Sequence, residues 1–268
     1  REVFFENSDG RIVLMYPLLG RVLVGTTDIP VDDPNDVECT DEEIDYFFEL
    51  VGHIFPGIHL DRSQIVYRYS GVRPLPAAGD LSPGMVSRDY RIVQDRLGNF
   101  PLLSLVGGKW TTFRALGEHL STNVMNVLGI ARTVSTRNLP IGGGRDFPRT
   151  REAVWSWISA HAGNQERAEM LLTRYGTYAE RFLLELASES ETWLEHTPGF
   201  SKEEIAFLVR EEQILSLSDL IFRRTSLGFR GEISSASLRE LAEIVGNELG
   251  WGLDERQKEQ KSVGVAAR

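Results

Sequence analysis

The chain has 268 residues, 41% of them hydrophobic and 25% charged, a composition typical of folded globular proteins that excludes wholesale disorder. This length suffices for one large or two ordinary domains. The formal net charge is −10, most of it within residues 151–260, which disfavours binding to nucleic acid or to anionic lipid through charge alone. The single cysteine, Cys39, excludes an internal disulfide and is typical of a reducing compartment.

The N-terminal residues predict an antiparallel meander followed by a helix. Residues 3–5, 11–16 and 21–25 are strand-like, and Asp9-Gly10 is a strong hairpin signal. The third strand ends in Gly25-Thr-Thr-Asp28, where we expect Asp28 to play a structural role by binding nearby N–H groups. Thr40-Asp-Glu-Glu43 is a capping box that opens a helix, which Pro56-Gly57 closes.

Two arginines follow in the next strand-like runs. Residues 64–69 alternate in polarity and predict a strand that leads into Ser70-Gly-Val-Arg-Pro-Leu75, so Arg73 is expected at a strand end. Arg88 belongs to a second strand-like run, residues 85–93. Guanidinium groups bind phosphate bidentately and an ammonium adds a point charge. Arg73, Arg88 and Lys109 are therefore candidate phosphate ligands.

The residues around Lys109 combine a strand, a glycine pair and a helix. Residues 102–106 are almost wholly apolar and predict a buried strand, and residues 113–128 predict a helix. Gly107 and Gly108 lie between them, so free N–H groups, the positive end of a helix dipole and Lys109 are expected at one spot. Such a spot favours an anion or an electron-rich ring, although an ordinary tight turn explains the glycine pair equally well.

Two standard phosphate-binding motifs are excluded. A P-loop requires a glycine where the chain has Leu103, and a serine or threonine where it has Trp110. The dinucleotide fingerprint fails at Phe147, which stands in place of the third glycine. His53 and His59 have no second ligand at metal spacing, so we expect solvated loop histidines and no metal site.

The second half of the chain predicts a helical bundle with no chemistry of its own. Residues 131–150 contain Gly142-Gly-Gly144 and two prolines and are typical of a linker. The apolar stripes beyond them indicate a core rather than a cofactor site. Residues 257–268 are expected to be a frayed tail. The expected helices cover residues 151–161, 165–175, 178–187 and 205–210, a run from Ser216 or Ser218 to Gly228, and a run from Ser234 or Ser235, with N-caps Asn164 and Thr177 and a capping box Ser201-Lys-Glu-Glu204.

The motif Gly107-Gly-Lys-Trp-Thr-Thr-Phe-Arg114 closely resembles the Gly-Gly-Lys-x-Thr-Thr-(Tyr/Phe)-Arg signature of FAD-dependent glycerol-3-phosphate dehydrogenases. The family's N-terminal Rossmann segment is absent, so we expect a C-terminal part of such an enzyme that binds FAD weakly and turns over nothing alone. Further blocks that resemble the family in the same order are Gly25-Thr-Thr-Asp28, Ser70-Gly-Val-Arg-Pro-Leu75, Ser87-Arg-Asp-Tyr90, Arg223-Arg-Thr-Ser-Leu-Gly228 and Leu249-Gly-Trp251.

The resemblance implies an α+β fold in which part of the antiparallel-sheet substrate domain of a D-amino-acid-oxidase-like flavoprotein precedes an all-α C-terminal bundle. The implied boundaries are residues 1–130 for the C-terminal part of the catalytic domain, 131–150 for a linker, 151–256 for the helical domain and 257–268 for a tail. The implied location is the cytoplasm, with peripheral contact to the cytoplasmic membrane, and a homodimer is compatible with it.

The implied reaction is oxidation of sn-glycerol 3-phosphate to dihydroxyacetone phosphate, with hydride passing to FAD and electrons then passing to quinone in the respiratory chain. We expect Arg73 and Lys109 to face one hollow and, with Arg88, to bind the phosphate. No histidine lies in a matched block, so no general base is assigned. The residues implied for FAD binding are Gly107, Gly108, Lys109, Trp110, Thr111 and Thr112.

Three alternatives stay open. A glycerol-3-phosphate oxidase would pass the electrons to oxygen, and nothing in the sequence separates it from a dehydrogenase. An oxidase of the amino-acid oxidase type is disfavoured by the helical second half and the paired arginine motifs. A non-catalytic docking module would use residues 151–255 to bind a partner, although their acidic charge disfavours direct binding to lipid.

Overall fold

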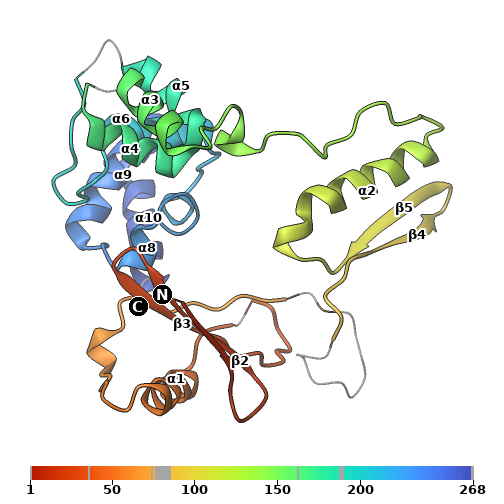
Figure 1. Cartoon of the computed structure of the whole chain (residues 1–268), viewed down its shortest axis with the longest axis horizontal. Helices are drawn as coiled ribbons and strands as arrows, with labels where there is room; N and C mark the ends of the chain where they lie inside the picture. Colours follow the sequence, from red (N-terminus) through yellow and green to blue (C-terminus); the bar gives the residue numbers. More distant parts are fainter. Residues whose placement is uncertain are drawn as a thin grey trace.

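The computed structural model describes residues 2–35, 37–73, 75, 86–161, 163–186 and 190–266. Figure 1 shows three parts: a small sheet with one helix, a β-hairpin with one helix, and a helical bundle. The predicted α+β class with a helical second half is confirmed. The parts follow one another along the chain, and the end of the first sheet lies beside the bundle (Figure 1).

The first part is the predicted meander. Strands β1 (Val3–Glu6), β2 (Ile12–Leu18) and β3 (Arg21–Gly25) form an antiparallel sheet in that order. Helix α1 (Asp41–Ile54) packs on it through a core that contains Val13, Met15, Leu50 and Val51. Both halves of the Thr40–Glu43 capping box form, so the helix starts where the sequence predicted.

The segment after α1 is not the predicted strand. A short 3₁₀ helix, η1 (Arg62–Gln64), is capped by Asp61, and residues 65–73 have no regular secondary structure. The strand predicted from the alternation at residues 64–69 was wrong. Tyr67 and Tyr69 pack against aromatic side chains of the helical bundle. Pro74 and residues 76–85 lie outside the described residues.

The second part is an antiparallel hairpin of β4 (Arg91–Leu97) and β5 (Phe100–Val106), with helix α2 (Phe113–Val127) alongside. The predicted strand at residues 102–106 exists but is not buried, since Leu102 and Leu105 remain 44% and 41% exposed. The strand expected from residue 85 begins only at Arg91, so Arg88 lies in the irregular segment before it.

The linker is attached to the bundle through its glycine run. The 3₁₀ turn η4 (Gly142–Gly144) meets η5 (Gly176–Tyr178) so closely that a Cβ on Gly143 would lie 1.8 Å from the Tyr175 carbonyl oxygen. Thr177 does not cap a helix as predicted. Its hydroxyl donates to the carbonyl oxygens of Gly143 at 3.0 Å and Arg145 at 2.6 Å, and this holds the linker in place.

Replacing Gly143 with alanine is expected to lower the free energy of unfolding by about 1–3 kcal/mol, because the new methyl group meets backbone that cannot turn away. Gly144→Ala is the matched control, since a Cβ there meets nothing within 4 Å. Urea denaturation of both variants checks the expectation. Equal stability of the two variants would show that the linker does not depend on this contact.

The third part is the bundle. Asn164, Ser201, Ser216 and Ser234 cap their helices as predicted. The helix expected from Ser216 to Gly228 is broken instead, because Thr225 is extended between a π-turn and a final helical turn. The bundle consists of α3 (Arg151–His161), α4 (Gln165–Tyr175), α5 (Ala179–Leu186), α6 (Lys202–Glu211), α7 (Leu217–Asp219), the π-turn η6 (Leu220–Arg224), α8 (Leu227–Arg230), α9 (Ser235–Leu249) and α10 (Leu253–Ala266).

The end of the chain is not the frayed tail that its polar sequence predicted. Helix α10 continues to Ala266, and Val263 is fully buried in the main core of the bundle. Glu259 accepts a hydrogen bond from the Leu217 backbone N–H at 2.9 Å. Arg256 also donates to the Trp251 carbonyl oxygen at 3.0 Å and to Asn247 at 2.9 Å. These contacts fix a helix that has no apolar stripe in its sequence.

A buried ion cluster joins α4 to α6. Ser201 accepts from the Glu204 N–H at 3.1 Å, but the Glu204 carboxylate does not complete the predicted capping box. It is fully buried and pairs with Arg167 at 2.7 Å and Arg174 at 2.8 Å, while the Tyr175 hydroxyl donates to it. Burial alone would lower the pKa of Arg167, but the charges of Glu204 and Glu191 raise it.

Within the described residues, none of the helices is both long and apolar enough to cross a membrane.

Candidate functional site

Two of the candidate arginines meet at one carboxylate. Asp28 follows β3, Arg73 lies in the irregular segment after η1, and Arg88 precedes β4. The Asp28 Oδ2 atom accepts from Arg73 Nη1 at 2.8 Å and from Arg88 Nη2 at 3.3 Å. All three side chains stay partly exposed, at 29%, 41% and 40% respectively. Asp28 therefore binds guanidinium groups from distant segments rather than the nearby N–H groups expected from its turn position.

Lys109 lies next to this cluster but outside it. Its Nζ pairs with Asp89 Oδ1 at 3.4 Å, and Asp89 adjoins Arg88 along the chain. This pair is exposed, so it contributes at most about 1 kcal/mol. Arg73 lines a cavity that Lys109 does not line. The expectation that both residues face one hollow therefore does not hold for this cavity.

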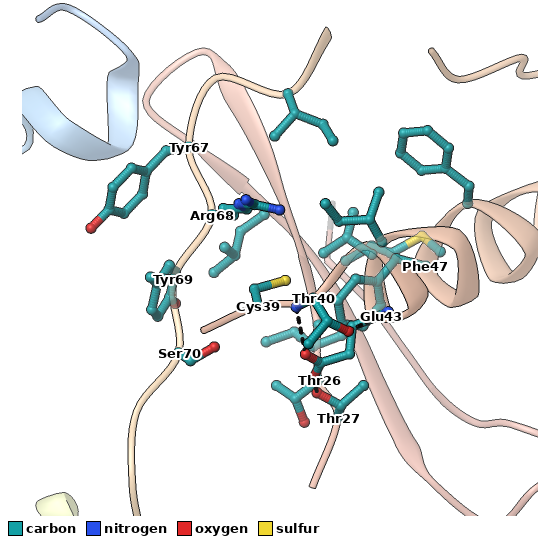
Figure 2. A pocket seen from close by; sticks show the side chains of 18 of the residues that line it. Thr26, Thr27, Cys39, Thr40, Glu43, Phe47, Tyr67, Arg68, Tyr69 and Ser70 are labelled. Atoms are coloured by element: carbon teal, nitrogen blue, oxygen red, sulfur yellow. Dashed lines mark hydrogen bonds between the residues drawn. The ribbon is translucent and has the colours of Figure 1, made fainter. Parts of the chain in front are cut away.

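The cavity that Arg73 and Asp28 line lies between β2–β3, α1 and residues 60–73, and its volume is about 1540 Å³. Figure 2 shows one wall formed by Tyr67, Arg68, Tyr69 and Ser70, across from Thr26, Thr27, Thr40 and Glu43. The Thr27 hydroxyl donates to Glu43. Burial and the nearby Glu43 charge raise the pKa of the Cys39 thiol, which favours its protonated form.

The glycine pair is required by the local packing of the chain. Gly107 and Gly108 have φ of +75° and +122°. A Cβ on Gly107 would lie 3.1 Å from the Asp89 carbonyl oxygen, and one on Gly108 would lie 3.1 Å from Leu116 Cδ1. Positive φ and close packing therefore favour glycine at both positions, whatever the following amides bind.

Those amides open a helix that lacks a side-chain cap. No side chain caps the 3₁₀ turn η3 (Trp110–Thr112), which follows Lys109, and the Thr112 hydroxyl does not cap α2. The Thr112 hydroxyl instead donates to the Lys109 carbonyl at 3.0 Å, and Trp110 is 91% exposed. An uncapped helix start beside an ammonium suits an anionic group. The residues therefore fit the anionic edge of a reduced flavin, with Lys109 as the cation.

Glu118 ties α2 to the start of the linker. Its carboxylate accepts from the Thr136 N–H at 2.7 Å, and Arg114, the last residue of the glycine–lysine motif, donates to it at 3.1 Å. The Thr136 hydroxyl and backbone, with Ser135 and Arg114, lower the pKa of Glu118 from 4.5 to about 2. No sequence pattern indicates this contact, because Glu118 and Thr136 meet only in the folded chain.

Because folding lowers the pKa of Glu118, its stabilising effect is present above pH 4.5 and is lost as the pH falls toward about 2. Glu118→Gln should speed hydrogen exchange at the Thr136 amide at pH 6, since a neutral amide accepts more weakly. Glu49→Gln, an exposed carboxylate on α1, is the control and should leave that amide unchanged. Unaltered Thr136 exchange in Glu118→Gln would rule the contact out.

Two family models match the chain. Residues 1–120 match the FAD dependent oxidoreductase model, and residues 134–256 match the C-terminal domain of alpha-glycerophosphate oxidase. Together with the fold, these matches define a flavin-dependent oxidoreductase that carries a helical C-terminal part. FAD is the cofactor of this class.

Several curated relatives are similar to most of this chain. A glycerol-3-phosphate dehydrogenase from Synechocystis sp. is 29% identical over 94% of this chain and 46% of its own length. The aerobic glycerol-3-phosphate dehydrogenase of Escherichia coli K12 is 31% identical over 83% of this chain and 45% of its own length. A D-erythritol 1-phosphate dehydrogenase from Brucella abortus is 31% identical over 82% of this chain and 44% of its own length.

The chain carries the domains of FAD-dependent oxidoreductases of the alpha-glycerophosphate oxidase type, and it is similar to FAD-dependent glycerol-3-phosphate dehydrogenases. It spans about half the length of the curated relatives it matches.

Proposed function

We propose that the protein containing this chain oxidises sn-glycerol 3-phosphate to dihydroxyacetone phosphate, with FAD as the hydride acceptor and quinone as the next electron acceptor. The observation that supports it most is the convergence of Arg73 and Arg88 on Asp28 within motifs that resemble the family. Two partly exposed guanidinium groups held together by one carboxylate are suited to bind a phosphate dianion from the substrate.

Before substrate binds, Asp28 holds Arg73 and Arg88 together. Its carboxylate keeps two cations close that would otherwise repel each other. A phosphate group carries more negative charge and more acceptor oxygens than one carboxylate oxygen, so it can replace or share this contact. Arg73 and Arg88 would then orient the secondary alcohol at C2, and orientation is a large part of the catalytic advantage.

The oxidation removes a hydride from C2 and a proton from its hydroxyl group, which leaves a ketone. FAD, when bound, supplies the two-electron acceptor. We propose that the amides after Gly107-Gly108, with Trp110, Thr111, Thr112 and the Lys109 ammonium, hold the flavin and stabilise negative charge on its reduced form. The proton requires a general base, and no described residue is assigned to that step.

Anaerobic mixing of the full-length, flavin-loaded protein with substrate tests the proposal. We expect sn-glycerol 3-phosphate to bleach the flavin absorbance near 450 nm, on the order of one equivalent per flavin. Glycerol, which lacks the phosphate, is the control and should bleach it far more slowly. No bleaching by glycerol 3-phosphate, or preferential bleaching by D-erythritol 1-phosphate, would contradict the proposed substrate.

The electron acceptor is tested separately. Reoxidation by a soluble quinone that is much faster than reoxidation by oxygen is the expected result for a dehydrogenase, whereas the reverse order would indicate the oxidase.

We further propose the division into a catalytic part (1–130), a linker (131–150) and a helical domain (151–256). We also propose peripheral contact of the full-length protein with the cytoplasmic membrane.

A further inference from the structure

The segment that carries Arg73 has no helix or strand of its own, yet it is held against the helical bundle. Tyr67 stacks on Phe222, with ring centroids 5.5 Å apart and planes inclined by 15°. Phe229 meets the edges of both tyrosines, at 5.5 Å from Tyr67 and 5.4 Å from Tyr69. Tyr67 also stacks on Tyr69 at 5.8 Å. We name these four rings the aromatic clamp.

The backbone next to the clamp is equally close. Gly231 ends α8 in the left-handed conformation, with φ of +66°, and a Cβ there would lie 2.7 Å from Val66 Cβ. The Arg230 carbonyl accepts from Arg21 Nε at 3.4 Å, which ties the same end of α8 to β3. The bundle therefore touches both the irregular segment and the sheet that precedes Asp28.

The bundle is locally shaped to present the two phenylalanines. Phe222 lies in the π-turn η6, a rare form of helix that often occurs at functional sites. A Cβ on Gly228 would lie 2.5 Å from Phe222 Cδ1, so a glycine is needed to seat that ring. The block Arg223-Arg-Thr-Ser-Leu-Gly228, which resembles the family, begins within η6 and ends at this glycine.

The clamp and Asp28 hold the two ends of one short piece of chain. Tyr67 and Tyr69 are fixed by Phe222 and Phe229, and Arg73, a few residues further on, is fixed by its contact with Asp28. Because residues 65–73 lack a strand ladder or helix, these side-chain contacts, together with the ion pair of Arg68 and Asp41 at 3.2 Å, set the path of the backbone. Loosening the clamp releases the segment while leaving the chemistry of Arg73 itself unaltered.

We propose that Phe222 and Phe229 are positioning residues for the substrate phosphate: they act through Tyr67 and Tyr69 to place the Arg73 guanidinium opposite Arg88. The inference rests on the proposed function. It gives the helical part a role in substrate affinity, in contrast to the absence of chemistry expected from its sequence.

Full-length, flavin-loaded Phe222→Leu and Phe229→Leu are the test variants. We expect each to raise the KM for glycerol 3-phosphate and the Ki for inorganic phosphate by about 2- to 10-fold, with kcat within about twofold and flavin content unchanged. Phe222→Tyr keeps the stacked ring and should restore the wild-type KM. Trp155→Leu, an exposed aromatic of α3, is the control for general effects on the bundle.

Hydrogen exchange separates the clamp from the proposed function. Amides of residues 65–73 should exchange faster in Phe222→Leu than in Trp155→Leu, whether or not glycerol 3-phosphate is the substrate. Unchanged exchange together with an unchanged phosphate Ki would overturn the inference. Faster exchange in a protein whose flavin no polyol phosphate reduces would instead reject the proposed function and retain the clamp.

Discussion

Replacing Glu204 with alanine is expected to lower the free energy of unfolding by about 3–5 kcal/mol, because removing one member of a buried ion cluster leaves its partners unpaired. Glu204 is fully buried, and its ion-pair partner Arg167 is 6% exposed. The Tyr175 hydroxyl would lose its acceptor, and Arg174 would keep only the Gly199 carbonyl oxygen. Glu191 would remain as a partner of Arg167 only.

Urea denaturation followed by far-ultraviolet circular dichroism measures this effect. Glu169→Ala is the matched control, an exposed glutamate in the middle of α4, and it should change the stability by less than about 0.5 kcal/mol. Similar unfolding midpoints and slopes for the two variants would show that the cluster does not hold α4 against α6.

Replacing Arg73 with alanine in the full-length enzyme is expected to raise the KM for glycerol 3-phosphate by about 10- to 150-fold, the equivalent of one lost hydrogen bond to a charged group. Flavin content should stay at the wild-type level, because Arg73 is not among the residues proposed to hold FAD. Arg73→Lys keeps the charge but loses the bidentate fork, so an intermediate KM is expected.

Arg62→Ala is the control for this prediction. Arg62 pairs with Asp41 and Asp45 on the same part of the molecule but away from Asp28. Steady-state kinetics with a quinone analogue give KM and kcat for each variant. A wild-type KM in Arg73→Ala, or an equal rise in Arg62→Ala, would remove Arg73 from the phosphate site.

Local signals in the sequence predicted much of the fold. Asp9-Gly10 lies in the turn between β1 and β2, and the Thr40 capping box opens α1. Asn164 caps α4 as expected. Each of these features depends on residues within a few positions of one another, so hydrogen bonding and backbone preference decide the outcome.

The failures have tertiary causes. The alternation of Tyr67 and Tyr69 suggested a strand, but the rings stack on a helix more than 150 residues away in sequence. The Thr177 hydroxyl binds the linker carbonyl of Arg145 instead of capping a helix. The Glu204 carboxylate likewise pairs with the buried Arg167 instead of completing a capping box. The polar tail is helical because Val263 reaches the core. Composition and spacing do not contain these pairings.

In the candidate site, too, local motifs were predicted from the sequence and tertiary contacts were not. Motif resemblance identified Arg73, Arg88 and Lys109, but Asp28, which joins the two arginines, lies 45 and 60 residues from them in sequence. The only hint was its position at the end of Gly25-Thr-Thr-Asp28. The separation of Lys109 from the Arg73 cavity depends on the placement of a whole hairpin, which no local pattern specifies.

The most direct test compares the rates of anaerobic flavin reduction by glycerol 3-phosphate and by glycerol in the wild type and in the Arg73→Met/Arg88→Met double variant. If the two guanidiniums recognise the phosphate, the wild type should prefer the phosphorylated alcohol by about 10³-fold or more in kcat/KM, as two lost charged hydrogen bonds would imply, and the double variant should lose nearly all of that preference. A double variant that retains flavin and discriminates as strongly as the wild type would contradict the proposed site.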